Sequence, residues 1–245
     1  MTSDTGKLTA ISKPEPRHPE TPRSFVTPVD SARLLRAKAA YTTRRVPVGA
    51  ACRLTTGQDT PASGDLVLAR VDRLGQHSRI ELGNGRRAHL FPGDEIILCY
   101  GHRYAPDQFE GEVPDSLAPC HMVAAGGIAA SALSRHAGKK AATRITPVGL
   151  LGDVHGNPVN IEDHALASDR PAANMPLTIA TVGTSMNAGK TTTAAYLIRG
   201  LAKAGLKVGA AKLTGTGAGG DVWLMTDAGA DLVLDFTDAG FASTH

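Results

Sequence analysis

The chain has 245 residues, of which 42% are hydrophobic, and its 26 basic and 23 acidic residues give a formal net charge of +3. Such a length and composition can form one large or two small globular domains with a proper core. The charge is mild and 4% of the residues are aromatic, which argues against nucleic acid as a partner. No apolar run approaches the roughly 18 residues of a membrane span, and no apolar secretory segment stands near residue 1. We therefore expect a cytoplasmic protein with no membrane partner.

The three cysteines, Cys52, Cys99 and Cys120, are widely spaced and form no C-x-x-C pair. An odd number at this spacing predicts neither a disulfide framework nor a zinc cluster. We interpret them as reduced thiols, in agreement with the expected cytoplasmic location.

The first two-thirds of the chain divide into a proline-rich arm and a β-rich region. Residues 1–29 hold five prolines among charged and small residues, a composition typical of a disordered arm. A short basic helix is expected at 31–40. From about residue 46 onward, short apolar runs alternate with Gly, Pro, Asn and Asp turn signals. This spacing predicts a small antiparallel β barrel or sandwich as a domain at 30–162, with strands at 66–71, 78–82, 87–91, 95–100 and 143–160.

Two stretches of this region could belong to a site. Residues 101–111 gather polar and charged side chains in one loop, although an ordinary surface connection is equally open. Gly126 and Gly127 precede an expected helix, where they could present backbone donors to an anion or could serve close packing. Several arginines between residues 70 and 87 suit either an oligonucleotide-binding barrel or the solvated face of a sheet.

The most informative segment is the run LTIATVGTSMNAGKTTT at residues 177–193, which we expect after a linker at 163–176. Its first six residues have the apolar pattern of a central parallel strand, and Gly189-Lys190-Thr191 closes a Walker A-type loop. In such a loop, backbone N–H groups and the start of the next helix face the phosphates. The lysine reaches the β- and γ-phosphates and the threonine hydroxyl ligates Mg²⁺. The predicted nucleotide-binding residues are Gly183, Thr184, Ser185, Asn187, Ala188, Gly189, Lys190, Thr191 and Thr192.

The residues that follow support a nucleotide site. Apolar side chains at helical spacing predict a helix from 191 to a C-cap at Gly205, and residues 208–211 predict the next strand. Strand, loop, helix and strand in this order form a βαβ unit, which predicts an α/β P-loop NTPase domain with a parallel sheet at 177–245. The alternative is a chance Gly-Lys-Thr at a helix start, where the threonines satisfy backbone donors and nothing more.

A glycine-rich loop follows the second predicted strand of this domain. So many glycines predict a backbone that approaches something closely, near the edge of the sheet where open α/β folds bind ligands. Lys212 at the strand end is a candidate catalytic residue that would hold an anionic substrate group or the γ-phosphate, or it is a surface lysine. Asp221 is a candidate Mg²⁺ ligand beside Thr191, and it could also serve as a helix N-cap.

These motifs resemble one group of P-loop NTPases. Gly183-Thr184 followed by Gly189-Lys190-Thr191, with threonine in the usual glycine position, is similar to the loop of dethiobiotin synthetase and the cobyrinic acid amide synthetases. The segment from Lys212 to Thr216 is similar to the one in dethiobiotin synthetase where a lysine and a hydroxyl residue contact substrate, although the usual proline is Leu213 here. The residues from Asp221 to Ala230 resemble those of MobB-type nucleotide-binding proteins. The resemblance covers about residues 177–236.

The resemblance implies Mg²⁺-dependent binding of ATP or GTP, with hydrolysis or phosphoryl transfer to a small carboxylate or carbamate metabolite. Lys190 and the metal would stabilise the transferred group, Thr191 and Asp221 would hold the metal, and Lys212 and Thr216 would orient the acceptor. A MobB-like accessory protein with little catalysis of its own is the alternative. A nucleic-acid-binding ATPase ranks last, and a homodimer is left open.

The end of the sequence gives this domain few strands. After Lys190, we expect strands at 208–211 and 231–236, whereas a doubly wound domain needs about five strands to bury its central ones. We therefore expect residues 177–245 to be the N-terminal part of an incomplete domain. A Walker B carboxylate would then lie beyond His245, with Asp235 and Asp238 as local substitutes.

Overall fold

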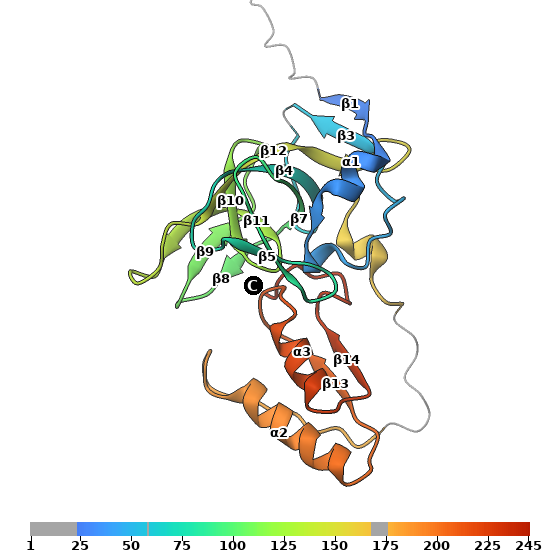
Figure 1. Ribbon diagram of the computed structural model, residues 1–245, viewed down its shortest axis with the longest axis vertical. Coiled ribbons are helices and arrows are strands. Elements are labelled where there is room, and N and C mark those ends of the chain that lie inside the picture. The colour runs from blue at the N-terminus through green and yellow to red at the C-terminus, as the bar shows by residue number, and fades with distance from the viewer. Residues whose placement is uncertain (1–23, 58, 168–175) are drawn as a thin grey trace, which may run out of the picture.

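A computed structural model describes residues 24–57, 59–167 and 176–245. Most of the predicted disordered arm and residues 168–175 of the predicted linker lie outside the described residues. Figure 1 shows a β-rich upper part, which we call the β-body (residues 24–167), and a smaller lower part, which we call the C-terminal unit (residues 176–245). Within the described ranges, no helix has the length and apolar character needed to cross a membrane.

The β-body is built on a ten-stranded mixed sheet in which β12 pairs with β3, β4 and β10. Because β10 pairs with β11, β11 with β7, and β7 with β4, five of these strands close a ring. The sheet strands are β1 (Phe25–Pro28), β2 (Lys38–Ala39), β3 (Arg53–Thr56), β4 (Leu66–Arg73), β7 (Glu95–Tyr100), β8 (Arg103–Tyr104), β9 (Phe109–Glu112), β10 (Cys120–Ala124), β11 (Ile128–Arg135) and β12 (Thr143–Gly152). A separate hairpin is formed by β5 (Arg79–Glu81) and β6 (Arg87–His89).

The predicted fold class is wrong: the β-body is β-rich as expected but has a mixed sheet, and the C-terminal unit is not a helix-flanked parallel α/β domain. The protein is mostly β, with 35% strand and 16% helix, and it has one large mixed sheet. The pairs β7–β11 and β2–β7 are parallel, so the β-body is not the expected small antiparallel barrel or sandwich. Alternating apolar residues predict strands well, but they carry no signal for which strands become neighbours or in which direction they run.

Alternation along the central strands buries both faces of the sheet. On β4, Val67, Ala69 and Val71 enter one apolar cluster, while Leu66 and Leu68 enter another on the opposite face. The second cluster is covered by α1 (Ser31–Arg36), whose Leu34 is buried, and by the 3-10 helix η2 (Ile161–His164). A second 3-10 helix, η1 (Tyr41–Thr43), is fully buried and lies beside β7.

Four local expectations in the β-body need correction. Residues 25–28 of the expected arm pair with β3 as an edge strand, a position that tolerates Pro28. The helix expected at 31–40 ends at Arg36, and residues 101–111 form the β8–β9 hairpin rather than an open loop. No helix follows Gly127, whose φ of 104° makes the turn between β10 and β11. Burial of the alanines of β11 in the sheet outweighs their helix propensity.

The C-terminal unit contains α2 (Lys190–Lys203), β13 (Gly209–Lys212), α3 (Gly220–Asp227) and β14 (Leu232–Asp235). The two strands are parallel and pair with each other, and α2 packs on α3 through a small apolar cluster. The strand expected at 177–182 does not form. Its apolar side chains stay in solvent, with Leu177 91% exposed and Val182 85% exposed. An apolar strand needs neighbours to satisfy its backbone and cover its side chains. The predicted helix-flanked parallel α/β domain is therefore wrong.

Candidate functional site

The Gly-Lys-Thr loop curls around the lysine ammonium at the start of α2. Asn187 and Gly189 both have left-handed backbone, with φ of 63° and 85°, and the helix begins at Lys190. Lys190 Nζ donates to the carbonyl oxygen of Ser185 over 2.5 Å. A Cβ at Gly183 would lie 2.9 Å from Lys190 Cγ, so this glycine allows the lysine stem to cross the loop. The predicted loop residues are thus brought together around one cation beside exposed backbone.

The other predicted loop residues line the same segment. Thr184 and Ala188 are exposed parts of the loop, whereas Thr191 is half-buried and Thr192 exposed in the first turn of α2. A helix start offers unpaired N–H groups and a partial positive charge, to which Lys190 adds a full one. This combination suits a phosphate group.

A second cation lies at the end of β13. Lys212 Nζ makes an ion pair with Asp221 Oδ2 in the first turn of α3. Burial lowers the pKa of Lys212, the carboxylate of Asp235 opposes this shift, and the ammonium of Lys190 adds to it. Lys212 is thus paired with Asp221 and stands in register with Asp235 on the neighbouring strand.

Thr216, the predicted substrate contact, lies beside the last residues of the chain. It forms an isolated antiparallel bridge with Ser243, and the next residue, Gly217, donates its N–H to the Ala242 carbonyl. A Cβ at Gly215 would lie 3.0 Å from Lys212 Cε, so this loop runs along the lysine stem. Thr216, the residue after Gly215, is half-buried.

The glycine-rich loop approaches the β-body rather than open ligand space. A Cβ at Gly217 would lie 2.5 Å from Thr42 Cγ2, and one at Gly126 would lie 2.0 Å from the Gly217 carbonyl oxygen. A Cβ at Gly219 would lie 2.5 Å from Trp223 Nε1. The close approach expected at these glycines is present, and it joins the two parts of the molecule. Gly126 serves the same packing.

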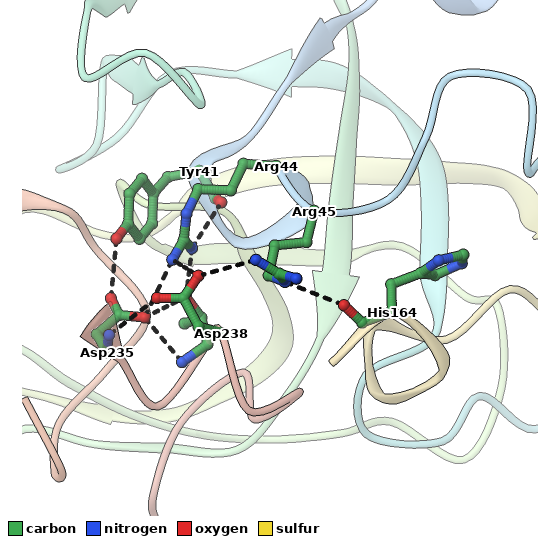
Figure 2. A network of polar contacts seen from close by, with 7 residues as sticks. Tyr41, Arg44, Arg45, His164, Asp235 and Asp238 are labelled. Atoms are coloured by element: carbon green, nitrogen blue, oxygen red, sulfur yellow. Dashed lines mark hydrogen bonds and ion pairs between the residues drawn. The ribbon is translucent and has the colours of Figure 1, made fainter. Parts of the chain in front are cut away.

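A buried ionic network at the same junction connects η1 to the end of β14 (Figure 2). Arg44 Nη2 lies 2.7 Å from Asp238 Oδ1 and 3.3 Å from Asp235 Oδ1, and its guanidinium stacks 4.0 Å from the centroid of the Tyr41 ring. Tyr41 Oη donates to Asp235 Oδ2 over 2.9 Å. Arg45 lies 3.7 Å from Asp238 and donates to the His164 carbonyl oxygen, as Figure 2 also shows.

This network was missed by sequence reasoning, which treated Asp235 and Asp238 as substitutes for a metal carboxylate. Both carboxylates are instead engaged by Arg44, and Asp235 Oδ1 also accepts the Thr237 N–H over 2.8 Å. Because their acceptor positions are occupied, they do not fit a metal site. Nothing in a single sequence links an Arg-Arg pair to two aspartates about 190 positions further on.

Outside that network, the described residues offer single oxygen donors of the type that magnesium takes beside a phosphate, and no all-protein metal site. The described residues contain no group of three or more His, Cys, Asp or Glu that could hold a metal ion. Mg²⁺ prefers oxygen ligands and is commonly held by one or two protein groups plus phosphate oxygens. The Thr191 hydroxyl, in the first turn of α2, and the Asp221 carboxylate, which the Lys212 ammonium holds, are oxygen donors of that kind.

The comparisons with known proteins add no family. A scan against protein-family models, a search of curated proteins and a search of solved structures each found no match to this chain. The resemblance of residues 177–236 to dethiobiotin synthetase-like proteins therefore stays a prediction.

Proposed function

We propose that the chain binds a nucleoside triphosphate with Mg²⁺ at residues 183–192. The bound nucleotide is hydrolysed, or its γ-phosphoryl group passes to a small carboxylate or carbamate metabolite. The observation that carries the proposal is the loop that folds back over Lys190 at the start of α2, and the Lys212–Asp221 pair at the end of β13 supports it. The proposal depends on this local geometry and not on the overall fold.

Phosphoryl transfer needs positioning and charge neutralisation more than covalent chemistry from the protein. Lys190 has a backbone carbonyl as its partner, which a phosphate oxygen can replace with a stronger, charge-assisted contact. Thr191 and Asp221 would hold the metal, which neutralises charge on the phosphates when bound. Lys212, at the end of β13, would orient the γ-phosphate or the acceptor. An ionised carboxylate acceptor needs no general base.

The test is binding of ATP and of GTP, with Mg²⁺, to the full chain and to Lys190→Ala. We expect the substitution to weaken binding at least tenfold, because it removes the cation around which the loop curls. Lys203→Ala at the far end of the same helix is the matched control and should bind like the parent. Equal affinity of the parent and Lys190→Ala, with unchanged circular dichroism, would refute the proposal.

A metabolite screen then separates the enzyme from the accessory alternative. Release of the nucleoside diphosphate that a carboxylate metabolite accelerates supports phosphoryl transfer. Slow release that no metabolite accelerates favours a MobB-like accessory protein.

A further inference from the structure

We infer that Tyr41 and Arg44 of the β-body are positioning residues for Lys212 and Asp221, because they hold the end of β14 and the first turns of α3 in place. The inference rests on the proposed function for what Lys212 and Asp221 do. It gives the β-body a role in the site, through two residues that lie outside the motifs at 177–236.

The first link runs through β14. Lys212 and Asp235 are in register on adjacent parallel strands, so their side chains leave the same face of the pair. The N–H of Phe236 donates to the Lys212 carbonyl oxygen over 3.0 Å, which ties the two strand ends together. A shift of Asp235 therefore moves the backbone that carries Lys212.

The β-body fixes Asp235 from two sides. Its side chain is 1% exposed, with Oδ2 bound by the Tyr41 hydroxyl and Oδ1 by the Arg44 guanidinium. Arg44 also holds Asp238, whose other oxygen accepts the Asp235 N–H over 2.9 Å. Both ends of this short turn are therefore attached to η1 and the residue after it.

The second link runs through α3. The edge of the Tyr41 ring meets Trp223, with centroids 6.3 Å apart and planes at 77°. Trp223 Nε1 donates to Glu81 Oε1 over 2.8 Å, and Glu81 is buried on β5 of the β-body. Since Asp221 lies two residues before Trp223, these contacts set the position of its carboxylate beside Lys212. One buried tyrosine thus contacts both elements that flank the lysine.

The test has one arm without nucleotide and one with it. Without nucleotide, hydrogen exchange of the Phe236 amide should be about tenfold faster or more in Arg44→Met, because the strand end loses its anchor. Exchange along α2 should not change. Arg33→Met is the matched control, since Arg33 pairs with Glu95 within the β-body and leaves the junction intact.

With nucleotide, Arg44→Met should lower kcat roughly tenfold to a hundredfold through misplacement of Lys212, with a KM within about twofold of the parent. Binding stoichiometry should stay at the parental value, which separates a positioning effect from loss of folded protein. Arg44→Lys keeps the charge and should restore part of kcat.

Tyr41→Phe is the second variant, and it tests the inference if Arg44→Met does not fold. It retains the ring that stacks on Arg44 and meets Trp223, and it removes the donor to Asp235. We expect intermediate exchange at Phe236 and an intermediate kcat, with the emission of Trp223, the sole tryptophan, unchanged.

Parental exchange at Phe236 in both Arg44→Met and Tyr41→Phe would overturn the inference, whether or not the chain binds nucleotide. Faster exchange with parental kcat would overturn it as well. Failure of nucleotide binding in the parent would instead refute the proposed function. The hydrogen-exchange arm, which needs no nucleotide, would still show whether Tyr41 and Arg44 hold the end of β14.

Discussion

Replacing Arg44 with methionine should destabilise the protein by about 3 kcal/mol, because it leaves two buried carboxylates without their cation. The side chains of Asp235 and Asp238 are 1% and 11% exposed, and that of Arg44 is 17% exposed. Breaking a buried ion pair by removing one partner costs about 3–5 kcal/mol. We expect the low end, since Asp235 keeps its hydrogen bonds from Tyr41 and Thr237. Methionine preserves apolar contact with the Tyr41 ring, so the loss reports on charge rather than on packing.

The assay is a double-mutant cycle with Asp235→Asn, measured by urea denaturation at pH 7. Asparagine removes the carboxylate charge, so the double variant should be more stable than the sum of the single losses by about 1 kcal/mol or more. The matched cycle of Arg33→Met with Glu95→Gln breaks a pair whose side chains are 37% and 28% exposed, and it should show a coupling below about 1 kcal/mol. Additive losses at Arg44 and Asp235 would refute the buried network as a source of stability.

Two further predictions concern His77 and Trp223. Burial, and then Arg103, lower the pKa of His77 to about 4. The unfolded chain therefore binds a proton first as the pH falls, and stability present above pH 6.5 should decline by about 3 kcal/mol towards pH 4. Urea denaturation of His77→Gln at both pH values should remove most of this decline, and a parental slope would contradict the assignment. Trp223→Phe removes the hydrogen bond to Glu81, a residue 1% exposed whose other oxygen has no partner among the described residues. The loss should be about 1–3 kcal/mol, and Glu81→Gln in the same background should recover part of it, whereas parental stability of Trp223→Phe would argue against the contact.

Local patterns in the sequence predicted the elements of the C-terminal unit to within two residues. The helix predicted from 191 and the strands predicted at 208–211 and 231–236 are confirmed as α2, β13 and β14. Helical spacing, a glycine C-cap and short apolar runs are properties of a few adjacent residues, so a single sequence contains them. The phosphate-binding role of the loop at 183–192 rests on the same kind of local signal and stays a prediction.

Features that depend on distant neighbours were not predicted. The run at 177–182 has the composition of a central strand, yet it finds no partner strand among the described residues and stays exposed. Gly126 was expected before a helix because the alanines after it favour one, whereas the sheet around β11 decides their conformation. The attachment of Arg44 to Asp235 needs the whole β-body to be folded before the two residues can meet.

Because the Arg44–Asp235 contact needs a folded β-body, the two parts of the chain fold in a fixed sequence. Arg44 and Asp235 lie 191 positions apart, so their contact closes a very long loop, whereas the β4–β7 pairing that supports η1 is far more local. The entropy of long loop closure is offset only after shorter contacts have reduced the free length of chain between its ends. During synthesis the strands of the β-body emerge well before residue 235, and N-terminal parts generally fold first. The ends of β14 and α3 therefore dock on a β-body that has already folded. Lys212 and Asp221 of the proposed site reach their final spacing in this last folding step.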